Sequence, residues 1–282
     1  MIIKNILSLI RFNKPIGTIL LLCPTLSALV VAARGIPPLY AILVFSSGVF
    51  LIRSAGCAIN DALDANFDKY VARTKDRPVA TGKIKKNDAI LVSMMLSLVA
   101  FIISVIYLKP KTLGLAVVAG ILFMTYPFMK RFFSLPQLYL GIAYSFGILM
   151  AFIEINGKLD ILTGLLFIAN LVWVFGYDTI YALVDRADDL KIGIKTSAIT
   201  LDNYVVIVIS LCYITCFTAW LLVGIILHLG IAYFIILAWV GGLLLYQVII
   251  LIKARTEFYF RLFLLNGWVG LAVFVGLIMG FI

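Results

Sequence analysis

Residues 41–84 read AILVFSSGVFLIRSAGCAI followed by NDALDANFDKYVARTKDRPVATGKI, an apolar run that passes directly into a dense cluster of charges. The apolar run contains one charged residue, Arg53, and is close to the roughly 20 mostly apolar residues that cross a membrane. The segment after it carries four aspartates and then several Lys and Arg residues. Such a cluster at the end of a membrane span is a solvated loop, an ion pathway or a catalytic site.

The composition of the whole chain is that of a membrane protein. Of its 282 residues, 64% are hydrophobic and only 13% are charged, and the mean hydropathy is +1.15. Soluble domains carry about a quarter charged residues. We therefore expect a polytopic protein surrounded by membrane lipid, with residues 1–282 forming a single transmembrane domain.

The net charge of +10 would suggest a nucleic-acid partner in a soluble protein. In a membrane protein, an excess of Lys and Arg in the cytoplasmic loops explains it, so we expect no nucleic-acid partner. The four cysteines lie in apolar runs without a CxxC pair. This predicts buried, reduced thiols rather than disulfides or a metal site.

Nine apolar runs are long enough to predict membrane-spanning helices, so the fold class is all-α. The N-terminal stretch faintly resembles a signal peptide, with charges before an apolar run and VAA after it. Arg11 and Lys14 interrupt its early part, and the run beyond them is long enough to span, which predicts a retained first helix. The predicted spans are approximately 16–33, 39–59, 88–107, 112–129, 137–153, 159–181, 204–226, 230–252 and 262–282.

The distribution of positive charge predicts the orientation. The two long connections, 60–87 and 182–203, both follow even-numbered spans and therefore lie on the same side of the membrane. Eighteen of the 23 Lys and Arg residues lie in the N-terminal segment or in connections after even-numbered spans, against four after odd-numbered spans. The positive-inside rule then places the N-terminus and both long connections in the cytoplasm, and the C-terminus outside.

Each long connection begins with acidic residues at helical spacing. Positions four apart lie on one face of a helix, so the first group forms a stripe about 12 Å long. The second group continues the sixth span in the same way, and the two stripes can face each other across a cavity. The groups are Asn60, Asp61, Asp64 and Asp68, and then Asp178, Tyr181, Asp185 and Asp188 or Asp189.

Clusters of oxygen ligands with no His or Cys nearby suit Mg²⁺, which binds one or two carboxylates together with substrate phosphates. Basic residues follow both clusters, as expected for a diphosphate held through Mg²⁺ and Lys or Arg. Two solvated loops would explain the basic residues but not seven aspartates at helical spacing. An ion-coupled transporter is disfavoured because the acidic residues lie at the ends of the spans and no broken-helix pair marks the midplane.

The motifs NDxxDxxxD at 60–68 and YxxxDxxDDxxxG at 181–193 resemble the two signature motifs of the UbiA superfamily of intramembrane prenyltransferases. Four ordered stretches narrow the resemblance to the bacterial 4-hydroxybenzoate polyprenyltransferases of ubiquinone synthesis. Ser27 departs from the pattern, which has Trp after PTL. The CDP-alcohol phosphotransferases require a DGxxAR run, which this chain lacks. The stretches are 11–29, 53–84, 126–137 and 176–198.

The resemblance implies nine helices in the bacterial inner membrane, around a central cavity that opens to the cytoplasm and is capped by two Asp-rich loops. It implies Mg²⁺-dependent transfer of a polyprenyl group from polyprenyl diphosphate to 4-hydroxybenzoate, at the ring carbon ortho to the hydroxyl. The alternative acceptors are those of sister enzymes, namely homogentisate, a naphthoate or haem.

The resemblance also implies roles for single residues. Asn60, Asp64 and Asp68 bind one Mg²⁺, and Asp185 and Asp189 bind the other. The four aspartates of these sets form the catalytic group. Asp61 and Asp188 are weaker candidates for metal ligands. The residues expected to hold the departing diphosphate are Arg73, Arg77, Lys191 and Lys195.

The acceptor carries a carboxylate and needs a cationic partner. The family pattern favours Arg131, because Arg recognises planar carboxylates with two parallel hydrogen bonds. Arg131 could instead anchor its helix at the interface. Arg53 lies inside a span, where a charge is costly, and is expected to face the cavity in a diphosphate or acceptor role. The remaining acceptor-site candidates are Tyr177, Asp178 and Tyr181. The rings of Tyr126, Tyr177 and Tyr181 are expected either to line the path of the allylic cation or to belong to the aromatic belt at the membrane interface.

The orientation can be tested by labelling single cysteines introduced at Lys85, Lys195 and Lys158 with an impermeant thiol reagent. Because the charge bias places the first two in the cytoplasm, they should react only from that side, and position 158 only from outside. Labelling of positions 85 and 195 from opposite faces would contradict a site shared by the two acidic stripes.

Overall fold

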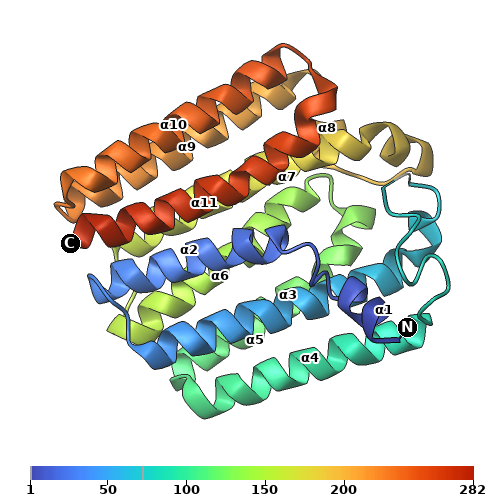
Figure 1. Cartoon of the computed structure of the whole chain (residues 1–282), viewed down its shortest axis with the longest axis horizontal. Helices are drawn as coiled ribbons and strands as arrows, with labels where there is room; N and C mark the ends of the chain where they lie inside the picture. The colour runs from blue at the N-terminus through green and yellow to red at the C-terminus, as the bar shows by residue number, and fades with distance from the viewer. Residues whose placement is uncertain (1, 72) are drawn as a thin grey trace.

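The computed structural model describes residues 2–71 and 73–282, and these residues form helices joined by connections of which the longest visible one separates α3 from α4 (Figure 1). Two short 3₁₀ helices, η1 (Asp202–Tyr204) and η2 (Thr256–Phe258), precede the membrane helices α9 and α11. The α-helices are α1 (Ile2–Leu9), α2 (Ile16–Ala33), α3 (Leu39–Asp68), α4 (Lys86–Tyr107), α5 (Pro110–Phe132), α6 (Pro136–Asn156), α7 (Ile161–Ile192), α8 (Ser197–Thr200), α9 (Val205–Ile226), α10 (Ile231–Ile252) and α11 (Tyr259–Phe281).

The nine predicted spans are confirmed. Within the described ranges, nine helices are long and apolar enough to cross a membrane, and each overlaps one predicted span. The sequence did not predict α1, a short helix before the first span. Its eight residues are too few to register as a span, and Lys4, Asn5 and Ser8 interrupt its apolar residues.

Helices α3 and α7 are the two longest, with 30 and 32 residues. At 1.5 Å per residue they measure about 45 and 48 Å, against about 30 Å for the hydrocarbon core. A capping box between Asp160 and Thr163 begins α7, and Gly193 ends it in a left-handed conformation with φ of 72°. The excess length of both helices carries the acidic motifs beyond the apolar region.

The helices differ strongly in how far they are enclosed by others. Helices α2, α6 and α7 are the most buried of the spans, and α11 packs against α2, so that the last span contacts the first (Figure 1). In α7, 61% of the apolar window is buried, whereas α4 has only 11% and α5 has 17%. Helices α4 and α5 are therefore the spans that face lipid most fully.

A buried hydrogen-bond network joins four of the membrane helices. Trp173 of α7 donates to Asn266 of α11 at 2.9 Å, and Asn266 donates in turn to Gln247 of α10 at 2.9 Å. Tyr213 of α9 donates to the same Gln247 oxygen at 2.9 Å. Because lipid tails are as apolar as leucine side chains, such polar contacts help to define which helices associate.

At the end of the bundle away from the acidic motifs, the buried Glu154 of α6 joins α3 to the α4–α5 connection. Its carboxylate accepts hydrogen bonds from the Tyr40 hydroxyl at 3.2 Å and from the Lys109 backbone N–H at 3.1 Å. The Lys109 ammonium also donates to the Glu154 carbonyl oxygen. These bonds hold the ends of α3, α5 and α6 together far from the acidic motifs.

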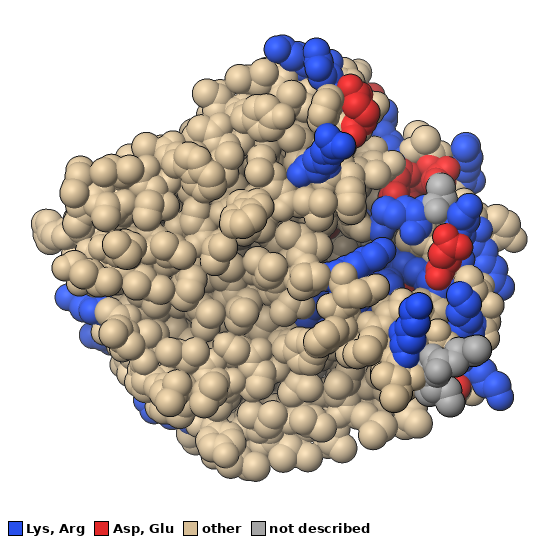
Figure 2. Space-filling view, in the orientation of Figure 1, with Lys and Arg blue, Asp and Glu red and all other residues tan. Residues whose placement is uncertain are grey.

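Charged residues gather at one end of the molecule (Figure 2). The N-terminus lies at this end and the C-terminus lies at the other (Figure 1). The ends of α3 and α7 with their following connections also lie there, so the two acidic segments share one side, as the sequence predicted.

Candidate active site

The acidic ends of α3 and α7 enclose a cavity of about 100 Å³, which adjoins a deeper cavity of about 280 Å³. Asp64 and Asp68 line the first cavity from α3, and Asp185 and Asp189 line it from α7. The prediction that the two stripes face each other is therefore confirmed. The residues that line both cavities are Arg73, Arg77, Tyr126, Asp178 and Tyr181.

Arg73 connects the first long loop to α7. Its Nε donates to both carboxylate oxygens of Asp185 at 3.0 Å, and its Nη2 donates to one of them. The guanidinium also lies over the Tyr181 ring, 4.5 Å from its centroid. Burial alone would lower the pKa of Arg73, but Tyr181 and Asp185 raise it above its ordinary value, so this side chain stays charged.

A second ionic network lies behind the first acidic motif. Asp61 is fully buried, and its Oδ1 is 2.6 Å from the Arg11 guanidinium and 3.3 Å from that of Arg77. Arg77 is also 2.8 Å from Asp68. Burial lowers the pKa of Arg11, and Asp61 opposes that shift. Asp61 thus fixes two arginines around the acidic end of α3.

Hydrogen bonds hold the two long loops over the smaller cavity. The Thr74 hydroxyl donates to the Asp68 carbonyl at 3.1 Å, which closes the first loop onto the end of α3. The Ser197 N–H donates to Gln137 of α6 at 2.8 Å, and the Ser197 and Thr179 hydroxyls are 2.7 Å apart. The loops are therefore ordered by the helices beneath them.

Arg53 lies in the wall of the deeper cavity, beside Cys57 and Asn60. Its Nε is buried and has no hydrogen-bond partner among the described residues, and the same holds for the Tyr177 hydroxyl. A Cβ on Gly17 would lie 2.3 Å from the Arg53 Nη2, so a larger residue at position 17 would force this guanidinium to shift. Unpartnered buried donors in a cavity wall are suited to a ligand with oxygen atoms.

Most of the predicted site residues lie in these cavity walls. The four that do not are Arg131, Asp188, Lys191 and Lys195. Lys191 is 3.6 Å from Asp188, and its side chain is 77% exposed. Lys195 donates to the Phe132 carbonyl, and Arg131 donates to that of Leu63 at 3.2 Å while lying 4.0 Å from Asp64. The predicted residues that line the cavities are Asn60, Asp61, Asp64, Asp68, Arg73, Arg77, Arg53, Tyr126, Tyr177, Asp178, Tyr181, Asp185 and Asp189.

Helical geometry explains why Asp188 and Lys191 lie outside. Asp185 and Asp189 are four residues apart and share the cavity face of α7, whereas Asp188 and Lys191 pair on a neighbouring face. Asp188 and Lys191 are therefore close to the cavity residues in sequence but do not line the cavity.

Sequence reasoning missed several cavity residues. Arg11 and Lys14 precede the first span and were used only for the orientation and for the retained first helix, although they lie in the stretch 11–29 that carries the family resemblance. The aromatic and amide residues had no local signal, because helices distant in sequence bring them to the site. The missed residues include Arg11, Lys14, Gln137, Tyr144, Phe260 and Phe263.

The donor set fits Mg²⁺ brought in with a phosphorylated substrate. Among residues 2–71 and 73–282, no three His, Cys, Asp or Glu side chains are grouped closely enough to hold a metal on their own. Mg²⁺ usually binds one or two carboxylates together with substrate phosphates, so such a group is not required. Asp64 and Asp68 supply carboxylates on one wall, and Asp185 and Asp189 supply them on the other.

The chain is a bundle of membrane helices with opposed carboxylates and arginines at one end. These features define an integral membrane protein with a site for an anionic ligand. A model described as the UbiA prenyltransferase family matches residues 21–270. The chain therefore belongs to the UbiA prenyltransferase family.

Curated relatives match nearly the whole chain. A protein of Nitrosospira multiformis named 4-hydroxybenzoate octaprenyltransferase is 46% identical, with 97% of this chain and 94% of the relative covered. A protein of the same name from Nitrosomonas europaea is 48% identical, with 96% and 92% covered. A UbiA homolog from Aeropyrum pernix shares the fold, with a TM-score of 0.81 at 22% identity and 93% and 96% of the two chains covered.

We expect Asp61→Ala to destabilise the protein, because it leaves the Arg11 and Arg77 guanidiniums without their shared carboxylate. Breaking a buried ion pair costs roughly 3–5 kcal/mol. Asp188→Ala, which removes a partly exposed carboxylate from the same site region, should cost less than about 1 kcal/mol. Thermal unfolding of both variants in detergent measures the difference. Equal effects would show that Asp61 does not support the site in this way.

Proposed function

We propose that this protein transfers a polyprenyl group from polyprenyl diphosphate to 4-hydroxybenzoate, in the ubiquinone pathway of a bacterial inner membrane. The observation that carries the proposal is that carboxylates of both acidic motifs line one cavity together with Arg73 and Arg77. The curated relatives that cover nearly the whole chain are named 4-hydroxybenzoate octaprenyltransferases, which supports this acceptor. Residues 1–282 form one catalytic domain, with its N-terminus in the cytoplasm and its C-terminus outside.

The reaction breaks the bond between the allylic carbon and a diphosphate oxygen, and the diphosphate leaves with the electron pair. A carbon–carbon bond then forms at the ring position ortho to the hydroxyl, and that ring carbon loses its proton. The barrier lies in the negative charge that develops on the leaving group. Preorganised positive charge next to that group is therefore the main catalytic requirement.

The cavity meets this requirement with groups of both signs. Asp64 and Asp68, assisted by Asn60, and Asp185 with Asp189 would hold Mg²⁺, which neutralises diphosphate charge when bound. Arg73 and Arg77 lie among these carboxylates and can donate to phosphate oxygens. The Asp185 carboxylate can bind Mg²⁺ once Arg73 turns from it to a phosphate oxygen. The existing ion pair thus supplies both a metal ligand and a phosphate donor.

The acceptor binds in the deeper cavity. Arg53 lines it and has a buried N–H without a described partner, whereas Arg131 lies beside Asp64 outside its walls. We therefore assign the acceptor carboxylate to Arg53, and a supporting contact with Asp64 to Arg131. The rings of Tyr126, Tyr177 and Tyr181 surround the path of the allylic cation and keep water from it. Asp178 lines the same path.

The metal assignment predicts that Asp64→Ala, Asp68→Ala, Asp185→Ala and Asp189→Ala each nearly abolish turnover. Each change would remove a ligand of the Mg²⁺ that neutralises charge on the leaving diphosphate. Membranes carrying each variant are assayed with labelled 4-hydroxybenzoate and a prenyl diphosphate. Activity of the unaltered protein should vanish with EDTA and return with Mg²⁺.

Asp202→Ala provides the matched control, because Asp202 pairs with Arg186 away from both cavities and should leave turnover unchanged. Full activity in the chelator, or ion transport without product, would contradict the proposed function. If product forms from homogentisate or a naphthoate but not from 4-hydroxybenzoate, the assignment of the acceptor is wrong and that of the metal site still stands.

The acceptor assignment predicts that Arg53→Ala raises the KM for 4-hydroxybenzoate and leaves the KM for the prenyl diphosphate nearly unchanged. An unpaired buried carboxylate costs on the order of 2–5 kcal/mol, and the group is bound alike in the ground and transition states. Gly17→Ala should have the same signature, because its Cβ displaces the Arg53 guanidinium. If Arg131→Ala alone raises the acceptor KM, Arg131 holds the carboxylate instead.

A further inference from the structure

The ring carbon of 4-hydroxybenzoate that is prenylated must lose a proton, and a base has to accept it. The metal ligands and arginines of the site act on the diphosphate, and Arg53 acts on the acceptor carboxylate. A general base must lie within hydrogen-bond reach of the proton that it takes. It therefore has to line the place where the smaller cavity, which receives the diphosphate, meets the deeper cavity, which receives the acceptor.

Among the described residues, five line both of these cavities, and only one of the five is a carboxylate. The five are Arg73, Arg77, Tyr126, Asp178 and Tyr181. An arginine stays protonated and has no acceptor atom, and a neutral phenol is a weak base. Asp178 is thus the one residue of this shared set that can accept a proton readily at neutral pH.

Helical geometry places Asp178 at a depth between the metal carboxylates and the residue that holds the acceptor carboxylate. Asp178 precedes Asp185 by seven positions on α7, so it lies about 10 Å deeper in the bundle. Arg53 precedes Asp64 by eleven positions on α3, which is about 16 Å. With the acceptor carboxylate on Arg53, the hydroxyl end of the ring points back toward the diphosphate. The ring carbon beside that hydroxyl then reaches the depth of Asp178.

Asp178 also has the accessibility that a base needs. Its side chain is half-buried, although its neighbours in sequence, Tyr177 and Thr179, are both buried. Because Asp178 lines both cavities, the surface that it retains is available to a bound ligand. Of the described residues around the deeper cavity, the other carboxylate is Asp61, which is fully buried and pairs with Arg11 at 2.6 Å. Asp61 is therefore already engaged in placing positive charge.

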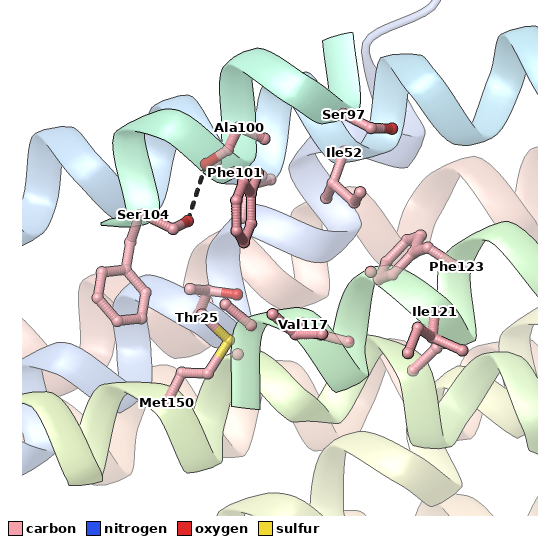
Figure 3. Close-up of a pocket in the computed structure, with 18 of the residues that line it drawn as sticks. Thr25, Ile52, Ser97, Ala100, Phe101, Ser104, Val117, Ile121, Phe123 and Met150 are labelled. Atoms are coloured by element: carbon pink, nitrogen blue, oxygen red, sulfur yellow. Dashed lines mark hydrogen bonds between the residues drawn. The ribbon is translucent and has the colours of Figure 1, made fainter. Parts of the chain in front are cut away.

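A larger cavity elsewhere in the bundle cannot supply the base. It has a volume of about 440 Å³ and lies between α3, α4 and α5 (Figure 3). Its lining side chains, such as Phe101, Ile121 and Met150, are apolar or carry only a hydroxyl, and none of those described is ionisable. The proton acceptor therefore has to come from the polar cavities.

We propose that Asp178 is the general base of the reaction, an inference that rests on the proposed function. Once the new carbon–carbon bond has formed, the ring is a cation, and its alkylated carbon carries both the prenyl group and a hydrogen. The Asp178 carboxylate takes that hydrogen as a proton. The electron pair of the C–H bond returns to the ring and restores its aromatic π system. The proton passes from the carboxyl group to water when the product leaves.

Deuterium in the acceptor ring gives a direct test of this role. Asp178→Asn keeps the size of the side chain but cannot accept the proton, so kcat should fall at least about a hundredfold. The KM of each substrate should stay within about threefold, because Asp178 holds neither the acceptor carboxylate nor the diphosphate. Proton loss becomes the slow step in this variant. 4-Hydroxybenzoate with deuterium at both carbons ortho to the hydroxyl should therefore react more slowly than the ordinary acceptor.

In the unaltered protein the two acceptors should react at equal rates, because departure of the diphosphate limits turnover. Asp178→Glu restores a carboxylate and should recover at least about tenfold of the lost kcat. Asp202→Asn makes the same chemical change away from both cavities and should keep the unaltered rate. Thermal unfolding in detergent checks that each variant is folded. If Asp178→Asn does not fold, the deuterium effect is measured on Asp178→Glu, whose displaced carboxylate should also make proton loss slow.

A loss of rate without any deuterium effect would overturn the proposal. An unchanged kcat would also overturn it and would leave an oxygen of the departing diphosphate as the base. A raised KM for the prenyl diphosphate in Asp178→Asn, without a deuterium effect, would place Asp178 among the groups that hold the diphosphate. Failure of the unaltered protein to prenylate 4-hydroxybenzoate would instead refute the proposed function.

Discussion

Helices α3 and α7 are longer than the hydrocarbon core is thick, and each therefore has an apolar part inside it and a charged part beyond it. Helical periodicity places the acidic residues of each extension on one face, and the packing of the bundle turns those faces toward each other. The cavities, the loop contacts and the arginine positions all depend on this shared excess length. A shorter α3 or α7 would leave its carboxylates at a depth where charge is costly.

The charge balance of the site is maintained by residues distant in sequence. Arg11 and Asp61 are 50 positions apart, and Arg73 and Asp185 are 112 apart. Asp61, Asp68 and Asp185 each lie next to a guanidinium that can exchange partners when an anionic ligand enters. The buried Asp61 holds two arginines at once, so it acts on the site by placing positive charge.

Residues whose position follows from helical repeat were predictable from sequence. The spans were found by apolar length, and the opposed faces of Asp64, Asp68, Asp185 and Asp189 follow from spacings of four. Residues placed by tertiary contact were not predictable. Arg11 reaches Asp61 through a turn with a left-handed backbone, φ 58°, which no local pattern announces. A further cavity of about 440 Å³ lies between α3, α4 and α5, and its apolar walls belong to helices whose sequences record only hydrophobicity.

The enclosure of the site within a bundle of membrane-spanning helices has a kinetic consequence. A substrate with a long hydrocarbon tail resides almost wholly in the bilayer, and its product is even less able to leave it. The protein then encounters its lipid substrate as a mole fraction among phospholipids, not as a concentration in water. Its rate should follow surface dilution by inert lipid at constant total substrate, while the small acceptor still obeys ordinary bulk concentration.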